Sequence, residues 1–127
     1  MDQNAEIIAN AIKGSLNIIE QEREREIISR RFGLSGQKET LEQIGDMLSI
    51  TRERVRQLEK AILIRLRINS EESKIPELSA AEKIIIRNLT EMGRIARVAD
   101  LADKIYGHTA SQSEKASLAF LGEISSV

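Results

Sequence analysis

Apolar residues recur along most of this chain at spacings of three and four, the period of one face of an α-helix. The clearest run begins at Thr40, where a polar start precedes two periodic segments separated by a short turn. Their apolar positions are Ile44, Leu48, Ile50, Val55, Leu58 and Ile62.

These two segments predict a helix-turn-helix. Thr40 and Gln43 have the spacing of a capping box, so we expect the first helix over residues 41–48. Thr51 can cap the second helix, expected to run to about residue 68. Gly45 is small enough to let the second helix approach closely, and Ile50 can fill the turn between two helices packed near a right angle.

The rest of the pattern also predicts helices and no convincing strand. Gly14 and Gly33 are expected to end two helices, and Ser79 with Glu82 is expected to cap another. The polar stretch 69–77 contains the only proline and is the candidate linker between a unit at 1–68 and one at 78–127. The remaining expected helices cover residues 2–13, 16–32, 80–92, 98–105 and 111–125.

Composition excludes several classes of protein. Apolar residues make up 41% of the 127 residues and aromatic ones only 2%, so the core of this all-α fold must be aliphatic. The absence of cysteine excludes disulfides and thiolate metal sites, and His108, the only histidine, has no second ligand. No apolar run approaches the roughly 20 residues that span a bilayer. We therefore expect a cytoplasmic protein, associated with the nucleoid, without membrane contact, metal or cofactor and without enzyme activity.

Positive charge is concentrated on the second helix of the pair. The chain as a whole has a net charge of -1, but residues 51–69 carry six basic side chains against two acidic ones. Because this surplus is small, we expect modest affinity for nucleic acid from this chain alone.

The outward face of that helix has the chemistry of base recognition. Arginine and glutamine can make bidentate contacts to guanine and adenine, and glutamate can accept from cytosine. A generic amphipathic hairpin is the alternative, but an indifferent solvent face would usually favour lysine and glutamate. The outward residues are Arg52, Glu53, Arg56, Gln57 and Lys60.

Residues 15–68 closely resemble region 4 of the bacterial sigma-70 family. The motifs that carry the resemblance are Thr40-Leu-Glu-Gln-Ile-Gly45 and Thr51-Arg-Glu-Arg-Val-Arg-Gln-Leu-Glu-Lys-Ala61, preceded by Arg25-Glu-Ile-Ile28 and Arg31-Phe-Gly-Leu34. The resemblance implies a domain that reads the promoter -35 element and docks on the β-subunit flap of core RNA polymerase, with an apolar patch around its first helices meeting the polymerase. It implies base contacts by Arg52, Glu53, Arg56 and Gln57, and backbone phosphate contacts by Arg54, Lys60, Thr40, Thr51 and Lys38.

The chain departs from a typical sigma factor in its surroundings. The other sigma domains are missing, so the resemblance does not imply independent initiation. Met1 suits a genuine N-terminus, and the stop at residues 125–127 without a closing strand suggests a truncated second unit, small and helical or winged-helix-like. The expected surface of that unit is neutral to acidic, which favours packing or protein interaction over a second DNA contact.

Three functions remain open from the sequence. The first is a sequence-specific protein of transcription initiation that binds double-stranded promoter DNA and RNA polymerase. The second is a stand-alone helix-turn-helix regulator that forms a homodimer through its second half. The third is a sigma-like adaptor that binds polymerase without DNA.

Overall fold

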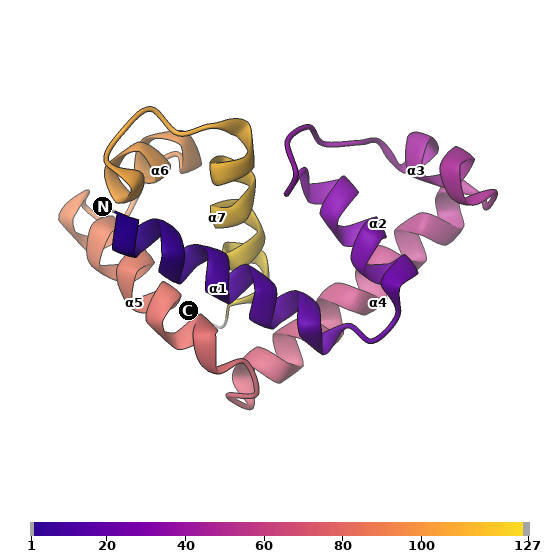
Figure 1. Cartoon of the computed structure of the whole chain (residues 1–127), viewed down its shortest axis with the longest axis horizontal. Helices are drawn as coiled ribbons and strands as arrows, with labels where there is room; N and C mark the ends of the chain where they lie inside the picture. The colour runs from indigo at the N-terminus through magenta and orange to yellow at the C-terminus, as the bar shows by residue number, and fades with distance from the viewer. Residues whose placement is uncertain (1, 126–127) are drawn as a thin grey trace.

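The computed structural model describes residues 2–125, which form seven α-helices joined by loops, without a strand in that range (Figure 1). The all-α fold class is therefore confirmed. The helices are α1 (Asp2–Ile18), α2 (Glu22–Phe32), α3 (Leu41–Leu48), α4 (Arg52–Glu71), α5 (Pro76–Glu91), α6 (Val98–Tyr106) and α7 (Gln112–Ile124).

The first two helices differ from the sequence prediction. Gly14 was expected to end a helix, but α1 continues through it to Ile18, and the expected helix over 16–32 is broken at residues 19–21. A Cβ at Gly14 would lie 2.5 Å from a carboxylate oxygen of Glu77, so this glycine leaves room for a side chain of α5. Ile19, only 3% exposed, anchors the break in the core.

The start of α5 is a second correction. Ser79 was expected to cap this helix together with Glu82, but α5 already begins at Pro76, in the first-turn position that suits proline. Glu82 instead accepts a hydrogen bond from the Ser125 hydroxyl, beyond the end of α7. A tertiary contact thus takes the place of the local cap.

Several predicted helix ends are confirmed. Gly33 is left-handed, with φ of 75°, and its N–H donates to the Ser29 carbonyl, which closes α2. The expected third helix of the second half begins with a capping box between Ser111 and Glu114. α4 extends slightly beyond its predicted end, to Glu71.

One large apolar cluster joins the two halves of the chain. It contains buried residues of α1 and α5–α7 together with Ile28 of α2 and Ile62 and Leu66 of α4. α1, which the sequence grouped with the helix-turn-helix, packs most extensively against α5. Only residues 72–75 separate α4 from α5 where a linker over 69–77 was expected, and Ile75 is buried within them. The boundaries drawn from the sequence stay a prediction.

A smaller cluster holds the helix-turn-helix. Ile27, Ile44 and Val55 are fully buried in it, so α2, α3 and α4 meet there. Figure 1 shows α3 at one end of the molecule, α5 and α6 at the other, and α4 extending between them. Two adjacent residues of α2, Ile27 and Ile28, belong to different clusters.

The expectations about the chain's ends rested on Met1 and on residues 125–127, of which Met1, Ser126 and Val127 lie outside the described residues. Within residues 2–125, no helix has the length and apolar character needed to cross a membrane.

The shared core generates a prediction about folding. Phe120 is fully buried in the large cluster, so Phe120→Ala should lower the free energy of unfolding by about 3–5 kcal/mol. Because the cluster spans both halves, we expect one urea transition by circular dichroism, shifted to lower urea. Ile86→Ala, at a position 44% exposed on α5, is the control and should cost under about 1 kcal/mol. A second transition in which α2–α4 stay folded would contradict the shared core.

Candidate nucleic-acid interface

The helix-turn-helix is built as its sequence pattern predicts. The Thr40 hydroxyl accepts from the Gln43 N–H at 3.1 Å, and the Gln43 side chain accepts from the Thr40 N–H at 2.8 Å. The Thr51 hydroxyl accepts from the Arg54 N–H at 3.1 Å and caps α4. Each capping hydroxyl still has its own proton, which it can donate to an acceptor outside the protein.

The turn between α3 and α4 depends on two small residues. Ser49 is left-handed, with φ of 59°, a conformation that costs a non-glycine residue roughly 1–2 kcal/mol. A Cβ at Gly45 would lie 2.8 Å from the Ile50 carbonyl oxygen, which is too close for any real Cβ contact. The close approach of the backbone at Ile50 therefore explains why position 45 requires a small residue, as the sequence predicts.

The predicted base-contacting residues share one exposed surface on the first turns of α4. Val55, between them in sequence, is fully buried and fixes the rotation of the helix about its axis. The exposed residues are Arg52, Glu53, Arg54, Arg56, Gln57 and Lys60.

Two of the predicted base-contacting residues are paired with each other. The Nε of Arg56 donates to the two carboxylate oxygens of Glu53 at 3.0 and 3.1 Å. Hydrogen bonds from Arg56 lower the pKa of Glu53, and the pairing raises the pKa of Arg56. Both side chains are more than half exposed, so the pair is worth little for stability and can open when a base edge competes for either partner.

Other cations near this surface are available to a ligand. Among the described residues, Arg52, Arg54 and Lys60 of α4, and Lys38 in the loop before α3, form no salt bridge or side-chain hydrogen bond. These four residues thus provide unneutralised charge for phosphate or base contacts.

A hollow with a volume of about 370 Å³ brings three elements of the interface together. Arg31 of α2, Thr40 at the start of α3 and Arg52 at the start of α4 line it, together with Leu41 and Glu42. The predicted phosphate position Thr40 and the predicted base position Arg52 are therefore neighbours across the two helices.

Sequence reasoning missed the part played by Arg31. Its Nε donates to Glu59 of α4 at 2.7 Å, and its terminal nitrogen contacts the Glu39 carbonyl at 3.3 Å. Arg31 and Glu59 are 28 positions apart, so no local spacing rule could pair them. This bridge joins α2 to α4 just behind the exposed surface and helps to hold its orientation.

The sequence names no residues for the apolar patch expected to meet polymerase, and that contact stays a prediction. The apolar face shared by α2 and α4 is covered in this structure. Ile28 of α2 and Ile62 and Leu66 of α4 are 0% exposed and belong to the cluster that contains α1 and α7. The expectation from sequence did not include this cover, since α1 and α7 are distant from these helices along the chain.

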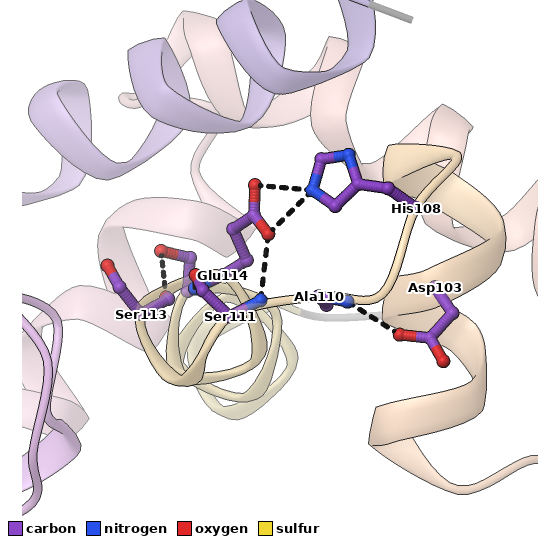
Figure 2. Close-up of polar contacts among 7 residues, drawn as sticks. Asp103, His108, Ala110, Ser111, Ser113 and Glu114 are labelled. Carbon is purple, nitrogen blue, oxygen red and sulfur yellow. Dashed lines mark hydrogen bonds and ion pairs between the residues drawn. The ribbon is translucent and has the colours of Figure 1, made fainter.

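His108 is a polar loop residue, as predicted, and it has a partner in α7 (Figure 2). Its Nε2 lies 3.0 Å from a carboxylate oxygen of Glu114, which also accepts from the Ser111 N–H at 2.9 Å. Burial raises the pKa of Glu114, but its contacts with Ser111 and His108 outweigh this effect and lower it. No cluster of three metal-ligating side chains occurs in residues 2–125.

Comparison with known proteins places the interface within a recognised module. The family model for sigma-70, region 4, matches residues 21–67. Residues of this chain are 39% identical over 70 positions to the chloroplastic RNA polymerase sigma factor sigF of Arabidopsis thaliana, covering 54% of the chain and 13% of the relative. They are 44% identical over 57 positions to the RNA polymerase sigma factor SigA4 of Synechococcus elongatus, covering 44% and 18%.

A third relative, the RNA polymerase sigma factor SigA1 of Synechococcus elongatus, is 48% identical over 46 positions, which is 35% of the chain and 12% of that protein. The chain therefore spans less than a fifth of the length of these curated relatives. No solved structure matches it.

The close contact at Gly45 generates a prediction. Gly45→Ala should lower the free energy of unfolding by about 1–3 kcal/mol, because the new methyl group would push against the Ile50 carbonyl. Gly122→Ala is the matched control: it lies in α7 with nothing within 4 Å of the added Cβ, so it should stabilise by about 0.5–1 kcal/mol. Urea denaturation of both variants tests the contrast, and equal shifts would show that position 45 is not crowded.

Proposed function

We propose, on the premise that residues 21–67 are a sigma-70 region 4 domain, that this chain reads a promoter -35 element through α4. The family match and the sigma factor relatives support a sigma-like DNA-binding role in transcription initiation. The finer assignment, a helix inserted in the major groove at the -35 element, is our proposal.

One observation carries the proposal. The first turns of α4 project unpaired cations and an amide away from a helix-turn-helix core that is closed by Ile27, Ile44 and Val55. The core holds α4 by its inner face, so the outer face is rigid and free for base edges. Such an arrangement reduces the side-chain and backbone ordering that binding would otherwise require.

The residues divide into two proposed groups. Arg52 and Gln57 read base edges directly, and Glu53 and Arg56 read them after their mutual pair opens. Contacts to phosphates position the domain on the duplex without reading sequence. The proposed phosphate contacts are Arg54, Lys60, Thr40, Thr51 and Lys38.

Binding of RNA polymerase is the second part of the proposal. The relatives are RNA polymerase sigma factors by name, but the matched segment is only a small part of each. We therefore propose that this chain binds core polymerase through the β-subunit flap and acts as a regulator. Its proposed location is the cytoplasm, in association with the nucleoid. Its proposed role is that of a binding protein and not an enzyme, and it does not include promoter melting.

Selection of bound duplexes from a random pool, with and without core polymerase, tests the function. We expect a single asymmetric site that resembles a -35 element and is enriched further when polymerase is present. A palindromic site with a stable dimer would indicate the homodimeric regulator instead. Enrichment of no sequence, with retained polymerase binding, would indicate the adaptor.

Substitutions at the base-contacting positions generate a prediction for the selected site. Arg52→Ala and Gln57→Ala should each weaken specific binding by roughly 1–3 kcal/mol and relax the preference at one base pair. Lys60→Ala, proposed to contact a phosphate, should weaken all sequences alike and reduce the salt slope by about one. Fluorescence anisotropy against the site and single-base variants measures these effects. Parental affinity and preference in both Arg52 and Gln57 variants would refute the groove assignment.

The pair on the exposed face generates another prediction. Glu53→Gln removes a negative charge from the interface and frees Arg56, so affinity for every duplex should rise and the salt slope should steepen by about one. Discrimination at one base pair should fall by about 1–3 kcal/mol. Glu6→Gln, an exposed carboxylate on α1, is the control and should change neither quantity. An unaltered base preference in the Glu53 variant would remove Glu53 from the reading set.

A further inference from the structure

The region 4 helices have an apolar face that is separate from the exposed base-contacting surface. We call it the apolar seat. It is formed by residues of α2, of the loop after it and of the second half of α4, all in the large cluster. These residues are Ile28, Phe32, Leu34, Ile62, Leu63 and Leu66.

α7 packs on this seat. Phe120 lies edge-on to Phe32, with ring centroids 5.2 Å apart, an arrangement that aromatic pairs favour. Phe120, Leu121 and Ile124 of α7 are 0% exposed. α7 thus covers the seat as an amphipathic helix covers a groove, with apolar residues at helical spacing.

Two polar contacts hold the edges of the arrangement. The Ser113 hydroxyl donates to the Leu34 carbonyl at 2.7 Å. At the other end of α7, Arg67 donates to both the backbone carbonyl and the carboxylate of Glu123, each at 2.8 Å. The Arg67 and Glu123 side chains are 45% and 50% exposed, so this pair lies at the rim and not in the core.

The seam between region 4 and α7 is open near the start of α7. A groove of about 240 Å³ separates Phe32 and Lys38 from Ala116 and Lys115. Both lysines line it, none of its lining residues is acidic, and neither lysine has a salt bridge among residues 2–125. The seam is therefore open here, and its two lysines beside apolar residues suit a segment that carries carboxylates beside an apolar side chain.

The matched family segment contains the seat but not the helices that cover it. Residues 21–67 contain the whole seat, whereas α1 and α7 lie outside that segment. A region 4 module without those helices would expose a contiguous apolar patch, and such patches mark protein-interaction sites. In this chain the patch is filled in cis.

We propose that the apolar seat is a helix-exchange site: α7 occupies the face through which this region 4 domain binds RNA polymerase. A polymerase segment that docks there, an apolar helix with acidic residues, must displace α7, beginning at the groove between Lys38 and Lys115. This inference rests on the proposed function and adds a regulation to it. A ligand that binds only the opened form has an apparent affinity reduced in proportion to the population of that form. Because α7 keeps this population small, α7 weakens polymerase binding. The proposed base-contacting residues of α4 are exposed in either form, so the position of α7 alone does not change the base preference. Lys38, which lines the groove, is the one proposed phosphate contact that lies where the polymerase segment would dock.

A covalent lock, compared before and after joining, tests the exchange in the full chain. The protein has no cysteine, so Arg67→Cys combined with Glu123→Cys provides a unique pair across the rim, joined by a flexible bis-maleimide. Circular dichroism before and after joining confirms that the fold is retained. Affinity for core RNA polymerase and for the selected duplex is then measured on the same preparations.

We expect the joined protein to bind core polymerase at least tenfold more weakly than the same protein before joining, with equal affinity for the duplex. Glu123→Arg, which sets two like charges at the rim, should bind polymerase several-fold more tightly than the parent. Glu91→Arg is the matched control, because Glu91 pairs with Lys104 between α5 and α6 at similar exposure but away from the seat. It should leave polymerase affinity unchanged.

Equal polymerase affinity before and after joining would overturn the exchange, because it would show that polymerase binds without moving α7. A gain in Glu91→Arg equal to that in Glu123→Arg would overturn it too, by assigning the effect to charge alone. If no variant binds polymerase while all bind the duplex, helix exchange fails and promoter reading stands. If the duplex is not bound either, the proposed function itself fails.

Discussion

The division of α4 between two cores is the constraint on which the rest of the structure depends. Its buried stripe begins with Val55, which closes the helix-turn-helix cluster, and continues with Ile62 and Leu66, which belong to the large cluster. A helix of 20 residues is about 30 Å long, so one element can serve both cores without a break. The exposed face at its start is therefore oriented by packing along the whole helix and not by the helix-turn-helix alone.

Because α4 belongs to both apolar clusters, the helix-turn-helix does not need a large core of its own. Only Ile27, Ile44 and Val55 are fully buried in the smaller cluster, too few to hold three helices with much stability. The bridge from Arg31 to Glu59 and the bridge from Arg65 to Glu24 tie α2 to α4 behind and below the interface. The large cluster then supplies the remaining stability through α1, α5 and α7.

Prediction from sequence succeeded where the physics is local. The capping box at Thr40, the end of α2 at Gly33 and the small residue at 45 all depend on neighbours within a few positions, and all three are present. It was wrong at Gly14 and Ser79. Glu77 lies against Gly14, and Glu82 pairs with Ser125, so both sites involve contacts between residues far apart in the sequence. The cover of the seat by Phe120 was equally invisible, because the apolar period of α7 shows that it buries a face but not against which helix.

The two ends of α4 carry exposed ion pairs that differ in their partners: one lies within α4, and the other joins α4 to α7. Glu53 and Arg56 pair within the helix, so opening that pair moves no other element, whereas Arg67 pairs with Glu123 of α7. An unbroken helix gives no hinge between these pairs, and Val55 and Ile62 hold its orientation on both sides of the middle. A change where α7 packs on α4 can therefore alter which protein surface is open without reorienting the exposed polar face at the start of α4. Under the proposed function, that separation allows a region 4 module to keep its DNA preference while helices outside the module regulate its access to a protein partner.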